Sequence, residues 1–208
     1  MSISLLAGLA AVTAIGQARE DPRKESNGSA QAGATTIVQT CSACHSLKYI
    51  AYNDLLNLGI GKQQLDELRG DNDLLSHIAA QLPEDVAKET YGVIPPDLSL
   101  MASAREGGAD YIYRMLTSFY QTPQGTTDNH AFAGTRMPDI LGISYATDQQ
   151  TVSQIRQTAH DATAFLEWAA DPKANERVTL GYYVIGYLLF LTVILYFWKR
   201  EIWKDVTD

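Results

Sequence analysis

Cys41-Ser42-Ala43-Cys44-His45 is the stretch that decides how the rest of the chain must fold. It contains the only two cysteines among 208 residues, separated by two positions and followed at once by a histidine. On one helical turn the two sulfurs share a face, so both can bond the vinyl groups of one porphyrin. The pattern is the signature of covalent c-type haem attachment, with His45 as the proximal iron ligand.

Two other uses of a C-x-x-C pair fit the sequence less well. A structural zinc ion needs four ligands, and the other histidines, His77, His130 and His160, are scattered without paired spacing. A thioredoxin-like redox motif needs a βαβ pattern around it, which the flanking residues do not supply. A zinc-stabilised membrane interaction protein without redox function is therefore the alternative from another functional class.

Composition limits the partners and the compartment. The chain carries a formal net charge of −8, with 18 acidic and 10 basic residues between Ser46 and Arg177. This excess favours a basic redox partner, and we expect no nucleic-acid partner. Because both cysteines are used for haem, no disulfide is expected. Attachment of c-type haem usually follows export, which predicts a haem domain outside the cytoplasm.

The N-terminal part divides into two predicted segments. Residues 1–18 are a signal-like apolar segment, because their apolar run is too short to span a bilayer but suits a signal peptide, with small residues Gly16 and Ala18 at its end. The usual basic residues before the run are missing. Residues 19–34, rich in charge, Gly, Ser and Ala, are predicted as a linker.

Hydrophobic periodicity predicts a mainly α-helical haem domain over residues 35–177. Prolines and glycines mark the expected helix boundaries. In chain order, we expect a helix over 35–52 that carries the haem motif, helical segments over 62–81 interrupted at Gly70, a short helix over 84–89, a helix between Pro95-Pro96 and Gly107-Gly108, another that starts near Asp110, loops over 121–146, and a long amphipathic helix over 148–170.

The sixth iron ligand has three candidates. Met137 lies in Gly134-Thr135-Arg136-Met137-Pro138, where irregular backbone rules out a helical apolar stripe. Ligation by its thioether would raise the haem potential and favour electron transfer. His130 is the rival and Met101 the third candidate. Arg105 is either a solvated cation at a helix C-terminus or a hydrogen-bond donor to a haem propionate.

The chain ends in a predicted membrane anchor over residues 178–198. This run of 21 residues contains no charge and is long enough to span a bilayer. Aromatic residues suited to the interface are Tyr182, Tyr183, Trp198 and Trp203. Lys199, Arg200 and Lys204 follow the run, so residues 199–208 are predicted as a cytoplasmic tail.

Several motifs together resemble the cytochrome c1 family, the haem subunit of the quinol:cytochrome c oxidoreductase (cytochrome bc1 complex). They are Cys-Ser-Ala-Cys-His-Ser-Leu, Pro-Pro-Asp-Leu-Ser, Ala-Arg-Glu-Gly-Gly-Ala-Asp-Tyr-Ile, Arg-Met-Pro, and Phe-Leu-Glu-Trp-Ala-Ala-Asp-Pro before a single span. The resemblance covers roughly residues 35–205. It implies a class I-like cytochrome c haem domain with a single C-terminal transmembrane helix.

The resemblance also implies the site and the function. By it, Cys41 and Cys44 hold one haem c, His45 and Met137 are axial ligands, Arg105 meets a propionate, and the pocket is lined by Pro95, Pro96 and Tyr111. As a non-catalytic subunit, the chain would pass one electron from a Rieske iron–sulfur protein to a c-type cytochrome. It would sit beside cytochrome b in a dimeric complex of the bacterial inner membrane, with its haem domain periplasmic. The alternative is a mono-haem subunit of a terminal oxidase or nitric oxide reductase.

Overall fold

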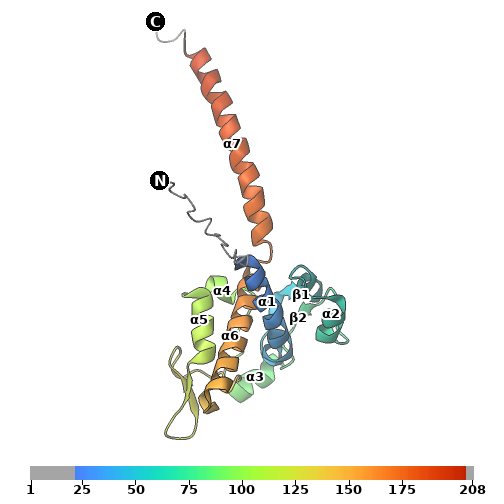
Figure 1. The fold of residues 1–208 in the computed structure, drawn as a ribbon, viewed down its shortest axis with the longest axis vertical. Helices are drawn as coiled ribbons and strands as arrows, with labels where there is room; N and C mark the ends of the chain where they lie inside the picture. The colour runs from blue at the N-terminus through green and yellow to red at the C-terminus, as the bar shows by residue number, and fades with distance from the viewer. Residues whose placement is uncertain (1–21, 205–208) are drawn as a thin grey trace, which may run out of the picture.

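The structure is a computed structural model that describes residues 22–204. The predicted signal-like segment, residues 1–18, lies outside the described residues, as do the first residues of the predicted linker and the end of the predicted tail. The described part is mainly helical, with two small two-stranded sheets. It confirms the predicted helical class with one C-terminal apolar helix (Figure 1).

The elements follow one another along the chain with short connections. The α-helices are α1 (Pro22–Gln39), α2 (Lys62–Arg69), α3 (Glu84–Tyr91), α4 (Met101–Ala104), α5 (Gly108–Thr117), α6 (Gln149–Ala170) and α7 (Ala174–Ile202). The 3-10 turns are η1 (Cys41–Ala43), η2 (Tyr52–Leu56) and η3 (Ile143–Tyr145). The strands are β1 (Leu47–Ala51), β2 (His77–Ile78), β3 (Phe119–Gln121) and β4 (Thr127–Asn129).

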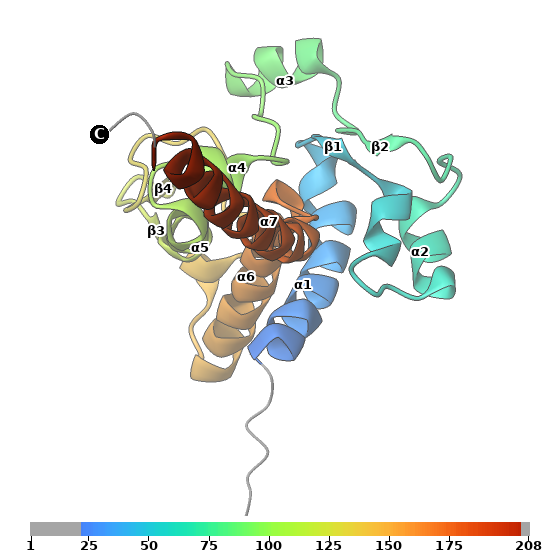
Figure 2. The same cartoon turned by 90° about the horizontal axis from the view of Figure 1, so that it is seen from above.

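The core of the domain lies where α1 packs along α6, which is the most extensive contact between two elements. Both views show these helices side by side, with α5 on the other side of α6 (Figures 1 and 2). Small residues let the two backbones approach closely. A Cβ built at Gly33 would lie 1.9 Å from the Asp161 carbonyl oxygen, and Ala34 and Ala162 are almost fully buried beside this point. Ile37 and Phe165 fill the adjoining space.

The predicted linker over residues 19–34 is wrong in its described part. Residues 22–34 belong to α1, and Ala30 and Ala34 are buried in the core. Glycine and serine usually mark loops because they lower helix stability. Here Gly28, Ser29 and Gly33 are helical, and the close packing against α6 outweighs their weak propensity. The folded domain therefore begins upstream of residue 35.

Two further predicted helices are interrupted by a small sheet. The predicted helix over 35–52 ends at Gln39, and residues 47–51 instead form β1, which pairs antiparallel with β2. The predicted segment over 62–81 ends at Gly70 as expected, but its second half forms a turn and then β2. Leu47 and Ile78 face each other across this pair and are both fully buried.

The region between α3 and α6 carries the glycines that the sequence placed at turns. Gly107 (φ +85°) and Gly108 (φ +50°) adopt the left-handed conformation that favours glycine and reverse the chain between α4 and α5. Residues 121–146, predicted as loop, also contain the β3–β4 hairpin. The predicted long helix over 148–170 is confirmed as α6, with Asp148 capping it by accepting a hydrogen bond from the Thr151 N–H.

Helix α7 projects away from the other elements (Figure 1). Its most apolar 18-residue window has a mean hydropathy of 2.1, and none of it is buried against the described part of the protein. A core helix of a soluble protein would be mostly buried, so α7 has the length and composition of a membrane span. It contains the predicted run 178–198 and extends beyond it at both ends.

Candidate functional site

The two cysteines and the histidine lie on one tight turn at the end of α1. The backbone N–H groups of Cys44 and His45 both donate to the Cys41 carbonyl, at 3.1 and 2.9 Å. Two residues that come much later in the sequence hold this turn in place. The Gln81 N–H donates to the Ser42 carbonyl, and the Leu82 N–H donates to the Ala43 carbonyl. The prediction that the two cysteines share one turn is confirmed. The turn follows the end of α1, however, and does not lie inside a longer helix as predicted.

Both thiols are free among the described residues, and each is half-buried. Burial, together with the neighbouring Cys44, raises the pKa of the Cys41 thiol to about 11. Cys41 therefore carries its proton near neutral pH, and it packs against the core cluster. Two free thiols three residues apart on one turn are the donor set that thioether attachment of a porphyrin requires.

His45 is oriented by a residue 51 positions further along the chain. Its Nδ1 lies 2.7 Å from the Pro96 carbonyl oxygen. A carbonyl can only accept, so Nδ1 must carry the ring proton. Nε2 then keeps its lone pair for a metal, an arrangement typical of ligating histidines. Burial lowers the pKa of His45, and this outweighs the opposite effects of the Pro96 hydrogen bond and the Asp97 charge.

Asp97 holds the segment that carries Pro96. Its carboxylate accepts hydrogen bonds from Ser46 Oγ and Lys48 N, both at 2.8 Å, and from Ser99 N at 2.9 Å. Burial would raise the pKa of Asp97, but the hydrogen bonds together lower it below its ordinary value. The ionised carboxylate thereby joins the chain just after His45 to the chain just after Pro96, which keeps the two partners together.

We expect Asp97 to contribute to the loss of stability in acid. Its pKa is lower in the folded than in the unfolded chain, so its contribution is complete above the ordinary pKa of about 3.9 and is lost as pH falls through the lower folded value. In urea titrations at several pH values between about 5 and 3, Asp97→Asn should be less stable at pH 5 and lose less on acidification than the wild type. Asp71→Asn, at an exposed position, should keep the wild-type slope; a wild-type slope in Asp97→Asn would refute the assignment.

Arg105 and Tyr111 lie together, as the sequence motif suggested. The Arg105 guanidinium donates to the Tyr111 hydroxyl at 3.0 Å, and its Cζ lies 4.7 Å from the centre of that ring. The ring of Phe132, which the sequence analysis did not single out, lies 5.9 Å from the same Cζ. Contacts of this kind hold a guanidinium in place without neutralising it, so the cation stays available for an anionic group.

The three candidate axial ligands lie in different settings. Met137 and Met101 are both partly buried and pack against the core cluster. The Met137 N–H donates to Thr135 Oγ1 at 3.2 Å, on the loop before η3. His130 is exposed at the end of the β3–β4 hairpin, where its ring stacks on Tyr120 with centroids 4.1 Å apart. This stacking engages the His130 ring.

Known proteins are similar to this chain over most of its length. The Cytochrome C1 family matches residues 24–206, which is nearly the whole described chain. The chain belongs to the cytochrome c1 family. The cytochrome c1 of Allochromatium vinosum is 32% identical over 209 residues, covering 86% of this chain and 84% of that protein. That of Rhodospirillum rubrum is 28% identical, covering 85% of this chain and 81% of that protein.

A mitochondrial relative and a longer bacterial relative also match this chain. The mitochondrial cytochrome c1 haem protein of Saccharomyces cerevisiae is 28% identical and covers 81% of this chain. A protein of Bradyrhizobium diazoefficiens called cytochrome b/c1 is 26% identical; its match covers 88% of this chain but only 34% of that longer protein. Membership of the cytochrome c1 family implies a haem c cofactor, and together with α7 it indicates a single-pass membrane protein.

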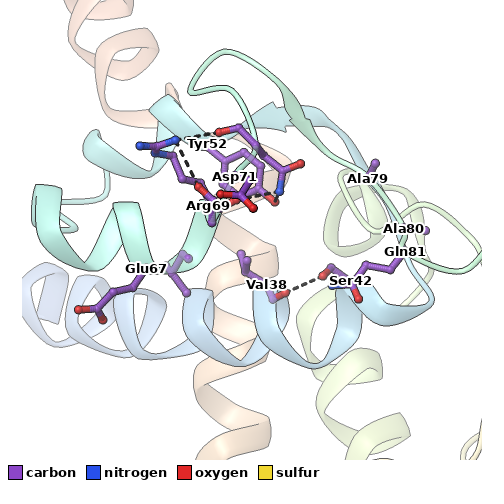
Figure 3. Close-up of a pocket in the computed structure, with 12 residues that line it drawn as sticks. Val38, Ser42, Tyr52, Glu67, Arg69, Asp71, Ala79, Ala80 and Gln81 are labelled. Carbon is purple, nitrogen blue, oxygen red and sulfur yellow. Dashed lines mark hydrogen bonds between the residues drawn. The ribbon is translucent and has the colours of Figure 1, made fainter.

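A cavity of about 500 Å³ lies beside the Cys41–His45 turn of this cytochrome c1 family member (Figure 3). Ser42, between the two cysteines, lines it, together with Gln81 and side chains from α2 and the turn that follows. Neither the cysteines nor His45 line this cavity. The cavity lies between α2 and the Cys41–His45 turn and is distinct from the His45–Pro96 site.

Several residues that shape the site were missed by sequence reasoning. Asp97 and Phe132 are two of them, and Asn129 and Asp139 are two more. Asp97 stood inside the quoted Pro-Pro-Asp-Leu-Ser motif, which was the available signal. For the other three, the sequence offered only polar and aromatic residues in a predicted loop, and nothing local distinguishes an anchoring side chain from a solvated one.

Proposed function

We propose that this chain is the haem-bearing electron-transfer subunit of a quinol:cytochrome c oxidoreductase. The observation that carries the proposal is the attachment turn: two free thiols and a histidine whose Nδ1 is fixed by Pro96. Membership of the cytochrome c1 family supports the same conclusion. The electron would come from a Rieske iron–sulfur protein and leave to a c-type cytochrome.

The residues fit one covalently attached haem c. Cys41 and Cys44 would bond the porphyrin through thioethers, and His45 would bind iron through Nε2, because Nδ1 is occupied. Met137 would be the sixth ligand. Arg105, held by Tyr111 and Phe132, would offer its guanidinium to a propionate, and Pro95 and Pro96 would line the pocket. When bound, the haem supplies an iron that carries one electron at a time.

In this function the chain's own residues would hold and orient the haem and its ligands, and they would take no part in bond-making chemistry. A half-buried, neutral His45 and an apolar Met137 would keep the ligand set free of protons that have to move with the electron. Asp97, together with the Gln81 and Leu82 N–H groups that bond the turn, holds the turn in place. We therefore assign no general acid, base or nucleophile to this subunit; the quinol chemistry belongs to its partners.

The partners and the orientation are part of the proposal. The Bradyrhizobium relative is named cytochrome b/c1, which supports a cytochrome b beside α7. Lys199 and Arg200 lie in the last turn of α7, and basic residues next to a span favour the cytoplasmic side. The haem domain would then be periplasmic on a bacterial inner membrane. The complex with cytochrome b would be dimeric.

The test is to purify the full chain with its native complex through a C-terminal tag. We expect a cytochrome b spectrum and a Rieske protein in the same preparation, and we expect quinol to reduce the c-type haem only when the Rieske protein is retained. Co-purification with an oxygen- or nitric-oxide-reducing enzyme instead would support the terminal oxidase or nitric oxide reductase alternative.

Met137→Leu should lower the reduction potential without releasing the haem. The thioethers hold the porphyrin whatever lies on its other side, whereas loss of a thioether ligand removes the ligation that raises the potential. A fall of at least about 120 mV is expected, two decades in the one-electron equilibrium constant. Redox titration of the purified complex measures it, with Met101→Leu as the matched control. A fall in Met101→Leu and not in Met137→Leu would exchange the two assignments.

The orientation can be tested with reporters fused after Asp208. Because Lys199, Arg200 and Lys204 should stay in the cytoplasm, a reporter that works only in the cytoplasm should be active there. A reporter that requires export should be inactive at the same position. The opposite pattern would reverse the predicted topology.

A further inference from the structure

The loop that carries Met137 is fastened at both ends by polar side chains. It leaves β4 at Asn129 and reaches η3 through Asp139. Met137 lies two residues before Asp139, and the intervening residue is Pro138. Between these two side chains the loop forms no helix or strand. Its path is therefore held by side-chain hydrogen bonds, by the His130 N–H that donates to the Ser118 carbonyl, and by the packing of Met137 and Leu141 against the core.

Asn129 ties the start of the loop to a helix. It is fully buried, and its Nδ2 donates to the Met115 carbonyl in the last turn of α5 at 2.7 Å. Its Oδ1 accepts from the N–H groups of Ala131 at 2.8 Å and Phe132 at 3.2 Å. An amide can donate and accept at once, so this one side chain joins the helix terminus to the loop.

Asp139 ties the end of the loop in a different way. Its Oδ1 accepts from the N–H groups of Gly142 at 3.0 Å and Ile143 at 3.3 Å, and its Oδ2 accepts from Ser144 N at 2.8 Å. Three donors around one carboxylate make a closed turn just after Pro138. The Asp139 carboxylate therefore closes the backbone on the C-terminal side of Met137 into a turn, and Gln121 Nε2 joins this turn to β3 by donating to the Ser144 carbonyl at 3.1 Å.

The restraint reaches the helical core. Met115 lies on α5, and α5 packs on α6, the helix that forms the core with α1. Phe132, whose N–H bonds Asn129, also places its ring near the Arg105 guanidinium. Breaking the Asn129 bonds would leave the Met115 carbonyl and the Ala131 and Phe132 N–H groups without these partners, which favours opening of the loop.

We propose that Asn129 and Asp139 are positioning residues for Met137, which set how firmly its sulfur is held at the sixth position. The proposal rests on the assignment of Met137 as the axial ligand given above. If the loop is already restrained, its sulfur would bind the iron without a further loss of loop conformational entropy. Small ligands from solution would then compete poorly with it. Neither residue needs to touch the haem for this effect.

The experiment is a titration of the ferric full-length chain, in its purified complex, with imidazole. Imidazole competes with the axial methionine, so its affinity reports how readily the loop opens. In its ionised form the carboxylate of Asn129→Asp keeps the size and the acceptors, but it loses the donor to Met115 and places a negative charge against that carbonyl. We expect imidazole to bind Asn129→Asp about tenfold more tightly than the wild type, the change that about 1.4 kcal/mol produces. The reduction potential should move in the direction of Met137→Leu.

Two control variants separate positioning from general stability. Ile37→Val weakens the α1–α6 core and should lower the urea midpoint while leaving imidazole affinity unchanged. Asp139→Asn removes a charge from the other end of the loop and should raise imidazole affinity even if Asn129→Asp does not accumulate. If both loop variants bind imidazole with wild-type affinity while Met137→Leu binds it more tightly, the positioning proposal is overturned and the assignment of Met137 as axial ligand stands. Wild-type affinity in Met137→Leu would overturn the axial assignment and the proposal with it.

Discussion

Replacing Cys41 and Cys44 together with alanine should leave the denatured chain with no haem. The two cysteines are the only ones in the sequence, and both lie on the turn that the Cys41 carbonyl closes. Without sulfur on this turn no thioether can form, and ligation by His45 alone does not survive denaturation. The effect is complete rather than graded, because it removes the covalent bonds themselves.

Haem staining after denaturing electrophoresis measures this result. Each single variant, Cys41→Ala or Cys44→Ala, retains one possible thioether and should give a weaker stained band. Met137→Leu is the matched control, since it alters the iron ligand but neither sulfur, and it should stain as the wild type does. A stained band of the right mass from the double variant would contradict covalent attachment at this turn.

Gly33→Ala should destabilise the haem domain by at least about 3 kcal/mol, the upper end of the usual cost of overpacking. The added Cβ would lie 1.9 Å from the Asp161 carbonyl oxygen, which is backbone and cannot rotate away. Helices α1 and α6 would have to separate. The buried side chains of Ile37 on α1 and Phe165 on α6 would then lose packing contacts with the opposite helix. A domain near the lower end of the usual range, with a free energy of unfolding of about 5 kcal/mol, would keep only about 2 kcal/mol.

Gly28→Ala is the matched control for Gly33→Ala on the same helix. Nothing lies within 4 Å of a Cβ at Gly28, so alanine should raise stability by about 0.5–1 kcal/mol through its better helix propensity. Urea unfolding of the full chain in detergent, followed by haem absorption, compares the two variants. Equal stability of both variants would show that α1 does not meet α6 at Gly33.

The two glycines explain why the start of the domain was misread from the sequence. Locally, Gly28, Ser29 and Gly33 are typical of a linker, and a propensity argument cannot distinguish a glycine in a loop from a glycine that a neighbouring helix requires. The reason for Gly33 lies at Asp161, far along the chain. Likewise, residues 47–51 become a strand because β2 pairs with them, and that partner is invisible in a local window.

The sequence by itself determined the Cys41–His45 turn, the C-terminal helix and the family. These features are local: thioether spacing is fixed within five residues, and an uncharged run of 21 residues is long enough to span a membrane. Only the tertiary structure decided which groups orient the site. The Pro96 carbonyl meets His45 across 51 residues, Phe132 joins Arg105 and Tyr111, and Asn129 bonds the end of α5. Such contacts depend on the path of the backbone between distant segments, which packing of α1, α5 and α6 sets and no local pattern records.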